Sequence, residues 1–493
     1  MTRQLANYLF AGSLVLSLVI AGCGGGSSSQ RIVGSVTLSP STAQSLAAGQ
    51  SLPITAAVAN DSNGAGVTWT LSGVGSLSDV TTTSVTYTAP SAVSSSQIVT
   101  VRATSKANPA ASATLQITVT SGGAQANVLS LSVNGGPVPG QLYANGAFAN
   151  VTLCVPGTSN CQTIGGVLVD TGSFGLRLLK SAVTLPLAPL TSGGSTINNC
   201  VQFVDGSFLW GQVAAADVHL AGEQASNVSV QLIADPTGFA IPTSCAAGGS
   251  NNNSLAALGA NGILGVGTEA QDCGPACDSS SGRPTPPVPA YYNCSTSGGC
   301  QPAFVSLAEQ ITNPVVKFPV DNNGVLVQMQ SLSGTATTAS GNLIFGIGTQ
   351  ANNALGSATI QTLNNVDNFT TAFNSQTLTS SFVDSGSNGL FFPDSAIATC
   401  TTASGFFCPP STLHLTAVNH GQNGTQTNIS FTVDNAQNLF NSNPSAAAFS
   451  TLAGPMSGGF DWGLPFFYGR NVFTSIRGQT MPSGAPAAPW WAY

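Results

Sequence analysis

Two similar stretches decide the fold: residues 167–176 read VLVDTGSFGL and residues 381–390 read SFVDSGSNGL. Six of the ten aligned positions are identical, and the offset between the copies is 384 − 170 = 214 residues. In each copy an apolar run leads into an Asp, a small hydroxyl residue and a Gly. This pattern predicts a buried strand that ends in a tight turn and presents a carboxylate there. An internal repeat of this kind predicts two similar halves.

The repeated residues Asp170 and Asp384 are the candidate catalytic pair. Two carboxylates that face each other about 3 Å apart do not both ionise, so they share a proton. The ionised partner can act as a general base on a water while the protonated partner hydrogen-bonds to a scissile carbonyl. Such a pair titrates as a unit, and this chemistry needs no metal, cofactor or histidine.

Three further residues in each copy are expected to support the Asp. The hydroxyl residue directly after it can hold the two loops together, the Gly permits a sharp backbone and close approach, and the following Ser can orient the carboxylate. These residues are Thr171, Gly172 and Ser173 in the first copy and Ser385, Gly386 and Ser387 in the second.

With these motifs the chain resembles the pepsin-like aspartic peptidases over roughly residues 142–480. Besides the two Asp loops, the resemblance rests on an opening hairpin at 142–169, an apolar strand with Gly at 261–267 and a strand crossing between lobes at 341–348. It also rests on residues 460–467, which resemble the strand beside the second Asp loop, and on 472–473. The chain also resembles a bacterial lipoprotein family of uncharacterised function that shares these motifs. The resemblance implies an all-β, bilobal domain with a central cleft and an Asp dyad, with no cofactor.

The expected flap of the cleft departs from the pepsin-like pattern. Members of that family place a Tyr on this hairpin, whereas residues 201–211 contain none. Phe203 and Val204 occupy the approximate position, and Phe208 or Trp210 is an alternative cover for the dyad. The other interpretation is that both aromatic residues only pack within the hairpin. A basic prosegment, which many of these enzymes carry, is not recognisable upstream of the domain.

Composition and charge exclude several classes of protein. The 493 residues include 10 Lys and Arg and 17 Asp and Glu, so 5% are charged, which excludes a disordered polyelectrolyte. The net charge of −7 leaves no basic surface for nucleic acid. The 56 Gly and the hydrophobic fraction of 42% favour an exported all-β protein with many short strands.

The first residues predict export and a lipid anchor. Residues 1–22 read as a signal peptide, because Arg3 precedes an apolar run shorter than the roughly 20 residues of a membrane span. The run ends in small residues and Cys23, which resembles a bacterial lipobox, so Cys23 is expected to carry the lipid. Residues 23–31 form a Gly/Ser tether. The residue after Cys23 is Gly24, and not the Asp that in many Gram-negative bacteria retains a lipoprotein in the inner membrane. The outer membrane of the cell envelope is therefore the expected location.

The other ten cysteines predict disulfides. Their even number in an exported chain favours pairing, and local pairs are the simplest arrangement, although the sequence does not prove connectivity. The expected pairs are Cys154 with Cys161, Cys200 with Cys245, Cys273 with Cys277, Cys294 with Cys300 and Cys400 with Cys408. The three histidines and these spacings match no common zinc site, so no metal is expected.

Residues 32–120 contain no cysteine and alternate apolar and polar residues in short runs, which predicts a β-sandwich. The module resembles bacterial immunoglobulin-like domains, with Trp69 and Tyr87 expected in its core, and it is interpreted as a spacer or, alternatively, an adhesion module. The predicted organisation is then a linker at 121–128, an N-lobe at 129–335 with a disulfide-tied insertion at 245–303, and a C-lobe at 336–493.

Two functions remain open at this point. The first is a membrane-anchored aspartic endopeptidase that hydrolyses extended peptides, with a peptide or protein as substrate in the cleft. The second is an inert binding or adhesion lipoprotein that keeps the scaffold. The two Asp residues and their hydroxyl partners favour the first function, and the changed flap favours the second. A serine hydrolase is disfavoured because Ser387 lies in no Gly-x-Ser-x-Gly elbow.

Overall fold

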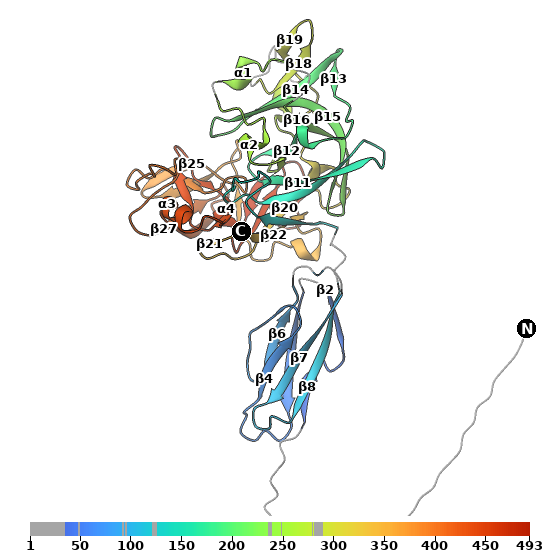
Figure 1. The fold of residues 1–493 in the computed structure, drawn as a ribbon, viewed down its shortest axis with the longest axis vertical. Helices are drawn as coiled ribbons and strands as arrows, with labels where there is room; N and C mark the ends of the chain where they lie inside the picture. Colours follow the sequence, from blue (N-terminus) through green and yellow to red (C-terminus); the bar gives the residue numbers. More distant parts are fainter. Residues whose placement is uncertain are drawn as a thin grey trace, which may run out of the picture. The chain divides into compact units, whose positions relative to one another are not determined.

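The protein is mostly β, with 46% of residues in strands and 8% in helices, which confirms the all-β prediction. The computed structural model describes residues 35–47, 50–90, 93, 96–120, 126–234, 239–247, 249–278, 280 and 289–493. The signal peptide, Cys23 and the tether lie outside these residues. The chain divides into two compact units, Met1–Gly122 and Gly123–Tyr493 (Figure 1). Within the described part of the chain, no helix combines the length and hydropathy needed to cross a membrane.

The first unit consists of two four-stranded sheets. One has the order β1-β3-β6-β5 and the other β2-β8-β7-β4. The strands are β1 (Val36–Ser39), β2 (Gln44–Ala47), β3 (Ser51–Val58), β4 (Val67–Ser72), β5 (Ser76–Ser78), β6 (Ser84–Thr88), β7 (Gln97–Ser105) and β8 (Ser112–Thr120). Alternating side chains of both sheets enter one apolar core, as period-2 strands require. Tyr87 is fully buried there as predicted, whereas Trp69 is only half-buried and donates its indole N–H to Thr81 O.

The first half of the second unit builds most of a sixteen-stranded sheet. Its strands are β9 (Val128–Val133), β10 (Phe148–Cys154), β11 (Cys161–Asp170), β12 (Phe174–Leu179), β13 (Thr191–Ser192), β14 (Ser195–Gln202), β15 (Phe208–Leu220), β16 (Glu223–Ile233), β17 (Gly262–Val266), β18 (Tyr291–Ser295) and β19 (Gly299–Pro302). Five strands from later in the chain continue the same sheet beyond β9, in the order β22 (Ala339–Phe345), β20 (Gly324–Met329), β32 (Asn471–Ser475), β33 (Trp490–Ala492) and β23 (Ile360–Thr362).

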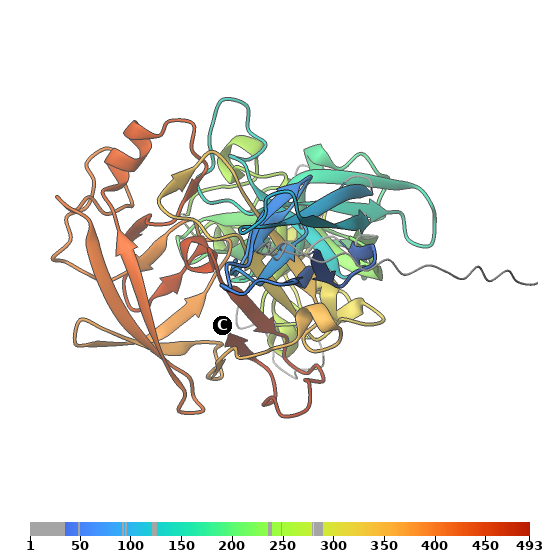
Figure 2. The same cartoon turned by 90° about the horizontal axis from the view of Figure 1, so that it is seen from below.

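The second half of this unit contributes a seven-stranded sheet of order β28-β27-β24-β25-β31-β26-β30. Its strands are β24 (Phe369–Phe373), β25 (Gln376–Val383), β26 (Leu390–Phe392), β27 (Leu413–His420), β28 (Gln426–Val433), β30 (Ala453–Pro455) and β31 (Asp461–Trp462), and β21 (Thr335–Ala336) pairs with β29 (Ala448–Phe449). Figure 2 shows these orange-to-red strands to one side of the green strands of the first half.

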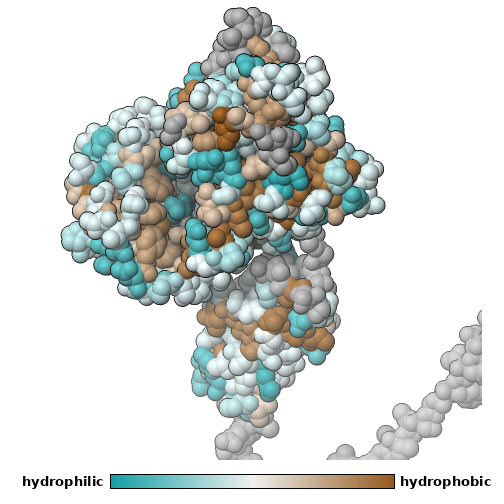
Figure 3. Space-filling view, turned by 45° about the horizontal axis from the view of Figure 1, so that its top comes forward, coloured by the Kyte–Doolittle hydropathy of each residue, from teal (hydrophilic) through white to brown (hydrophobic). Residues whose placement is uncertain are grey.

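The helices are short, and α4 (Leu464–Phe467) is buried in the apolar core. The α-helices are α1 (Thr243–Ala246), α2 (Leu255–Leu258), α3 (Ala436–Ser442) and α4 (Leu464–Phe467), and 3₁₀ turns occur at Lys180–Ala182, Gly274–Cys277, Pro314–Lys317 and Ala351–Asn353. One large apolar core draws residues from both halves of the second unit. The visible face of this unit carries a hollow bordered by apolar and polar residues (Figure 3).

The two halves repeat one strand arrangement around the Asp motifs. In the first half β11 runs parallel to β17 and β12 antiparallel to it, so that Val169 and Leu176 both pair with Leu264. In the second half β25 runs parallel to β31 and β26 antiparallel to it, with Val383 and Leu390 both paired with Trp462. The sequence repeat is therefore also a repeat of strand register.

All five predicted disulfide pairs are present. Cys154–Cys161 joins the ends of β10 and β11 at the tip of the opening hairpin. The other bonds are Cys200–Cys245, Cys273–Cys277, Cys294–Cys300 and Cys400–Cys408. Residues 281–288 of the expected insertion lie outside the described residues. Its residues 291–302 add the hairpin of β18 and β19 to the sheet edge beside β14.

Candidate active site

The structure brings Asp170 and Asp384 together. Asp170 is the last residue of β11, and Asp384 directly follows β25. A Cβ atom placed on Gly172 would lie 2.7 Å from Cγ of Asp384, and one placed on Gly386 would lie 2.7 Å from Cγ of Asp170. Each loop therefore approaches the opposite carboxyl so closely that only glycine fits. We call Asp170 and Asp384 the dyad.

The two loops are joined by reciprocal hydrogen bonds between buried hydroxyl residues. The backbone N–H of Thr171 donates to Ser385 Oγ at 3.1 Å, and the N–H of Ser385 donates to Thr171 Oγ1 at 2.9 Å. The same hydroxyls donate across the site, from Thr171 to Val383 O at 3.2 Å and from Ser385 to Val169 O at 2.8 Å. This arrangement matches the role expected for Thr171 and Ser385. Because these hydrogen bonds hold the backbones of the two loops together, they also fix the distance between the two carboxyls.

Each carboxyl is oriented by its own loop. The N–H of Gly172 donates to Asp170 Oδ1 at 2.8 Å, and the Ser173 hydroxyl donates to Oδ2. In the second copy the glycine N–H donates to Asp384 Oδ1 at 2.7 Å and the Ser387 hydroxyl donates to Oδ2 at 2.8 Å. The outer face of each carboxyl is thus hydrogen-bonded within its loop, and the two carboxyls turn toward each other.

The surroundings of Asp170 raise its pKa. Burial is the largest effect that raises the pKa of Asp170 well above its usual value, followed by the negative charge of Asp384 and a hydrogen bond between the two carboxyls. The hydrogen bonds from Ser173 and Gly172 oppose this shift. Asp170 is only 6% exposed. Burial, the negative charge of Asp384 and the bond between the two carboxyls therefore all favour a protonated Asp170.

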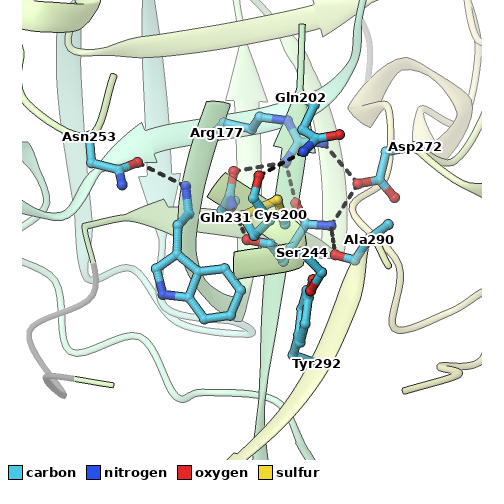
Figure 4. The surroundings of a disulfide bond; sticks show 12 residues. Arg177, Cys200, Gln202, Gln231, Ser244, Asn253, Asp272, Ala290 and Tyr292 are labelled. Carbon is cyan, nitrogen blue, oxygen red and sulfur yellow. Dashed lines mark hydrogen bonds and ion pairs between the residues drawn. A yellow bond between two sulfur atoms is a disulfide. The ribbon is translucent and has the colours of Figure 1, made fainter. Parts of the chain in front are cut away.

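The predicted flap is the hairpin of β14 and β15. Phe208 and Trp210 are buried in an apolar cluster with the Cys200–Cys245 disulfide, and Trp210 packs edge-to-face on Tyr292 at 5.2 Å. These two residues therefore have the packing role. Figure 4 shows this region, with Tyr292 and Ser244 on the same side of the disulfide. The hairpin turn places Phe203 half-buried and leaves Val204 80% exposed at the tip.

Tyr143 is a site residue to which the sequence pattern assigned no role. It lies in one apolar cluster with Phe203 of the hairpin turn. Burial and then the negative charges of Asp170, Asp384 and Asp205 raise the pKa of Tyr143. The phenol is therefore near both the dyad and the hairpin turn, and its hydroxyl makes no hydrogen bond with the described residues.

The Tyr143 ring is held in place by close neighbours. It packs edge-to-face on Phe148 with ring centroids 5.6 Å apart. A Cβ on Gly146 or Gly259 would lie 2.7 Å or 2.5 Å from ring atoms of Tyr143, so both positions must lack a side chain. The sequence signal that could have identified it is a Tyr at the start of the opening hairpin, followed within three residues by Gly146. A tyrosine is thus present near the dyad, although it comes from a different segment than the flap.

A buried polar network involves Arg177 of β12, the strand after the Asp170 loop. Arg177 of β12 is 1% exposed and forms an ion pair with Asp272 at 2.8 Å. Its guanidinium also donates to Asn199 and Gln231, and the hydroxyl of Tyr291 donates to Asp272. Figure 4 shows Arg177 between Gln231 and Asp272. The network ties the strand after the catalytic loop to the insertion.

A second ion-pair cluster joins three segments of the larger unit. Glu269 follows β17, Asp367 precedes β24 and Arg477 follows β32, and Arg477 pairs with both carboxyls. Burial is the main cause that raises the pKa of Glu269 to about 7, and a hydrogen bond with Asp367 adds to it, while Arg477 acts in the opposite direction. Glu269 therefore takes up a proton near neutral pH.

This cluster predicts a pH dependence of stability. Because the pKa of Glu269 in the folded protein is about 7, above its usual 4.5, its contribution to stability is fully present below about pH 4.5 and is lost as the pH rises through 7. In Glu269→Gln this contribution no longer titrates. We expect the free energy of unfolding of the larger unit to fall less between pH 4.5 and 7 in the variant than in the parent. Urea unfolding at a series of pH values measures both slopes, and equal slopes would contradict the assignment.

Comparisons with known proteins give a family but no activity. A family model described as "Protein of unknown function (DUF3443)" matches residues 123–493. No curated protein matches the chain. A solved structure of a DUF4784 family protein from Bacteroides caccae ATCC 43185 is similar at 8% identity and a TM-score of 0.15, covering 81% of this chain and 96% of that chain.

Proposed function

Because the chain belongs to the DUF3443 family, described as proteins of unknown function, we propose its function from the site alone: it is an aspartic endopeptidase. The observation that supports this proposal most strongly is the paired, hydrogen-bonded arrangement of Asp170 and Asp384 on two joined loops. Two carboxyls that share one proton can activate a water and protonate a carbonyl in the same step.

In the proposed reaction, Asp384 is the ionised general base and Asp170 the acid. Asp384 takes a proton from a water while Asp170 donates its proton to the carbonyl oxygen of the peptide, which gives a tetrahedral intermediate. On collapse, a proton passes to the leaving nitrogen and the C–N bond breaks. The backbone and serine hydrogen bonds hold both carboxyls in place throughout, so little reorganisation is needed.

The proposal includes the surroundings of the site. We propose that the larger unit is a pepsin-like bilobal domain whose cleft accepts an extended peptide, and that Val204 at the exposed tip of the hairpin contacts it. The first unit is proposed to be an immunoglobulin-like sandwich that acts as a spacer. A lipid on Cys23 would anchor the protein to the envelope, with the outer membrane as the proposed location.

The competing function is an inert binding or adhesion lipoprotein. The absence of a flap tyrosine favours it, because water exclusion and substrate alignment over the dyad would be weaker. Tyr143 bears on this point, since its phenol lies near both Asp residues and can supply a hydroxyl there.

The test is turnover of an unfolded protein substrate by the protein from about pH 3 to 7, with cleavage sites mapped by mass spectrometry. The expected result is endoproteolytic cleavage that a peptide transition-state analogue blocks, because such analogues bind more tightly than substrates. A folded protein without turnover at any pH would contradict the peptidase and would favour the binding function.

Tyr143 predicts a specific kinetic effect. In Tyr143→Phe the ring packing stays and the hydroxyl is lost, so we expect kcat/KM to fall about tenfold, as for the loss of one hydrogen bond in the transition state. Steady-state kinetics on a fluorogenic peptide measure this. Tyr87→Phe in the first unit is the matched control and should leave kcat/KM unchanged. An unchanged kcat/KM in Tyr143→Phe would show that the phenol only packs.

A further inference from the structure

A cavity of about 480 Å³ lies in the second half of the larger unit, within the size range of small-molecule sites. The segments that line it include β28, α4, residues 332–334 and residues 450–451. His414 and Ser430 also line it and are exposed, so the cavity opens to solvent. Neither residue of the dyad lines it. A ligand in this cavity would therefore not occupy the proposed catalytic site.

The apolar part of the lining is largely aromatic. Trp462 and Phe466 are buried, and Phe431 is half-buried. Phe431 packs edge-to-face on Trp462 with ring centroids 5.6 Å apart, and Trp462 packs on Phe466 at 5.3 Å. The buried side chains of Leu390 and Ile429 line the cavity beside them. Because aromatic rings pack well on one another in edge-to-face and offset arrangements, this lining suits a ligand with an apolar, ring-containing body.

Arg470 brings a positive charge to the lining, where its side chain is half-buried. Nη1 of Arg470 donates to Phe466 O at 2.6 Å, and the guanidinium carbon lies 4.6 Å from the centroid of the Phe466 ring. Among the described residues, its other N–H groups have no acceptor and its charge has no carboxylate partner. Burial is the main effect on the pKa of Arg470 and lowers it, while the charge of Tyr493 opposes the shift. An anion beside Arg470 would offset the cost of burying its charge.

The other polar groups of the lining leave Arg470 available to a ligand. Asp434 also lines the cavity, but its Oδ1 accepts a hydrogen bond of 2.5 Å from the Thr412 hydroxyl, and Asp434 forms no ion pair with Arg470. Thr451 is 8% exposed, and its hydroxyl has no hydrogen-bond partner within the described part of the chain. The lining thus combines an arginine without an acid and a buried hydroxyl without a partner, and a polar ligand group could satisfy both.

We propose that this cavity binds a small monocarboxylate with an aromatic body. Arg470 holds the carboxylate, since the planar guanidinium matches the geometry of a carboxylate. The rings of the ligand pack on Trp462, Phe431 and Phe466. This binding site goes beyond the proposed peptidase function and does not depend on it, because the dyad takes no part in it.

Three matched probes test the proposal by isothermal titration calorimetry on the full chain: 2-naphthylacetate, 2-(2-naphthyl)ethanol and 2-(2-naphthyl)ethylamine. They share one aromatic body and differ in the charge of the end group. We expect the carboxylate to bind about tenfold more tightly than the alcohol, or better, because hydrogen bonds to charged groups are strong. We expect the amine to bind most weakly. The proposal is overturned if the alcohol binds as tightly as the carboxylate, if the amine binds most tightly, or if none of the three binds.

One variant assigns the carboxylate preference to Arg470. Arg470→Met keeps most of the apolar stem and loses the guanidinium, so the carboxylate and the alcohol should then bind with equal affinity, while the affinity for the alcohol stays unchanged. Arg102→Met, in the first unit, is the matched control and should keep the tenfold preference. A preference retained in Arg470→Met would place the carboxylate elsewhere and overturn the proposal. The comparison of probes in the parent decides the proposal even if Arg470→Met does not fold.

Discussion

Replacing Asp170 or Asp384 by asparagine is expected to lower kcat/KM by roughly 10³- to 10⁴-fold, the upper part of the range for loss of a general acid or base. Asn can occupy the same space and accept the same hydrogen bond from the loop glycine, but it neither takes a proton from water nor donates one as an acid. Because the two carboxyls act as a unit, the double variant should be little slower than either single variant.

Both asparagine variants should fold. The parent buries two neighbouring carboxyls, and burial followed by the charge of Asp384 raises the pKa of Asp170. Removing one carboxyl removes a buried ionisable group and its repulsion of the other. The free energy of unfolding should therefore stay the same or increase. Cleavage rates on the substrate described above, together with urea unfolding, measure both quantities, and Asp394→Asn is the control. Undiminished cleavage by folded variants would place the activity elsewhere in the protein.

Replacing Arg177 by methionine is expected to destabilise the larger unit by about 3–5 kcal/mol, the usual cost of removing one partner of a buried ion pair. Asp272 would keep its charge or take up a proton without the guanidinium 2.8 Å away. Asn199 and Gln231 would also lose the donor that their side-chain oxygens accept from. The loss should appear in the unfolding transition of the larger unit, measured by calorimetry or urea.

Two further variants make this prediction specific. Arg102→Met removes an exposed arginine from the first unit and should change the free energy of unfolding by no more than about 0.5 kcal/mol. Combining Arg177→Met with Asp272→Asn should cost less than Arg177→Met alone, because no buried charge is left without its partner. If the double variant loses as much free energy of unfolding as the two single variants together, the broken ion pair is not the cause of the destabilisation.

Much of the site could be predicted because its determinants are local. The Asp-hydroxyl-Gly-Ser turns repeat at a fixed offset, and each turn orients its own carboxyl through hydrogen bonds to residues two and three positions later. The disulfide pairing was predicted for a similar reason, since four of the five bonds close loops of eight residues or fewer. The all-β class followed from composition and short alternating strands.

Other features depended on contacts across the molecule. Trp210 was a candidate cover of the dyad, and it packs instead on Tyr292 of the insertion, which adds strands at the sheet edge. Tyr143 and Asp384 lie 241 residues apart in sequence (384 − 143), and the charge of Asp384 acts on Tyr143 only because the two halves meet there. A strand pattern reports which residues are buried, but it does not report which buried residues face one another.

The sequence by itself determined the repeated Asp turns, the strands that lead into them and the residues that orient each carboxyl, because turn geometry and strand period depend on neighbouring residues. Only the tertiary structure decided that the two turns lie against each other, with Thr171 and Ser385 exchanging hydrogen bonds. These contacts form when distant strands pair and the apolar core of the unit packs. They therefore depend on the packing of the whole unit and not on any local pattern.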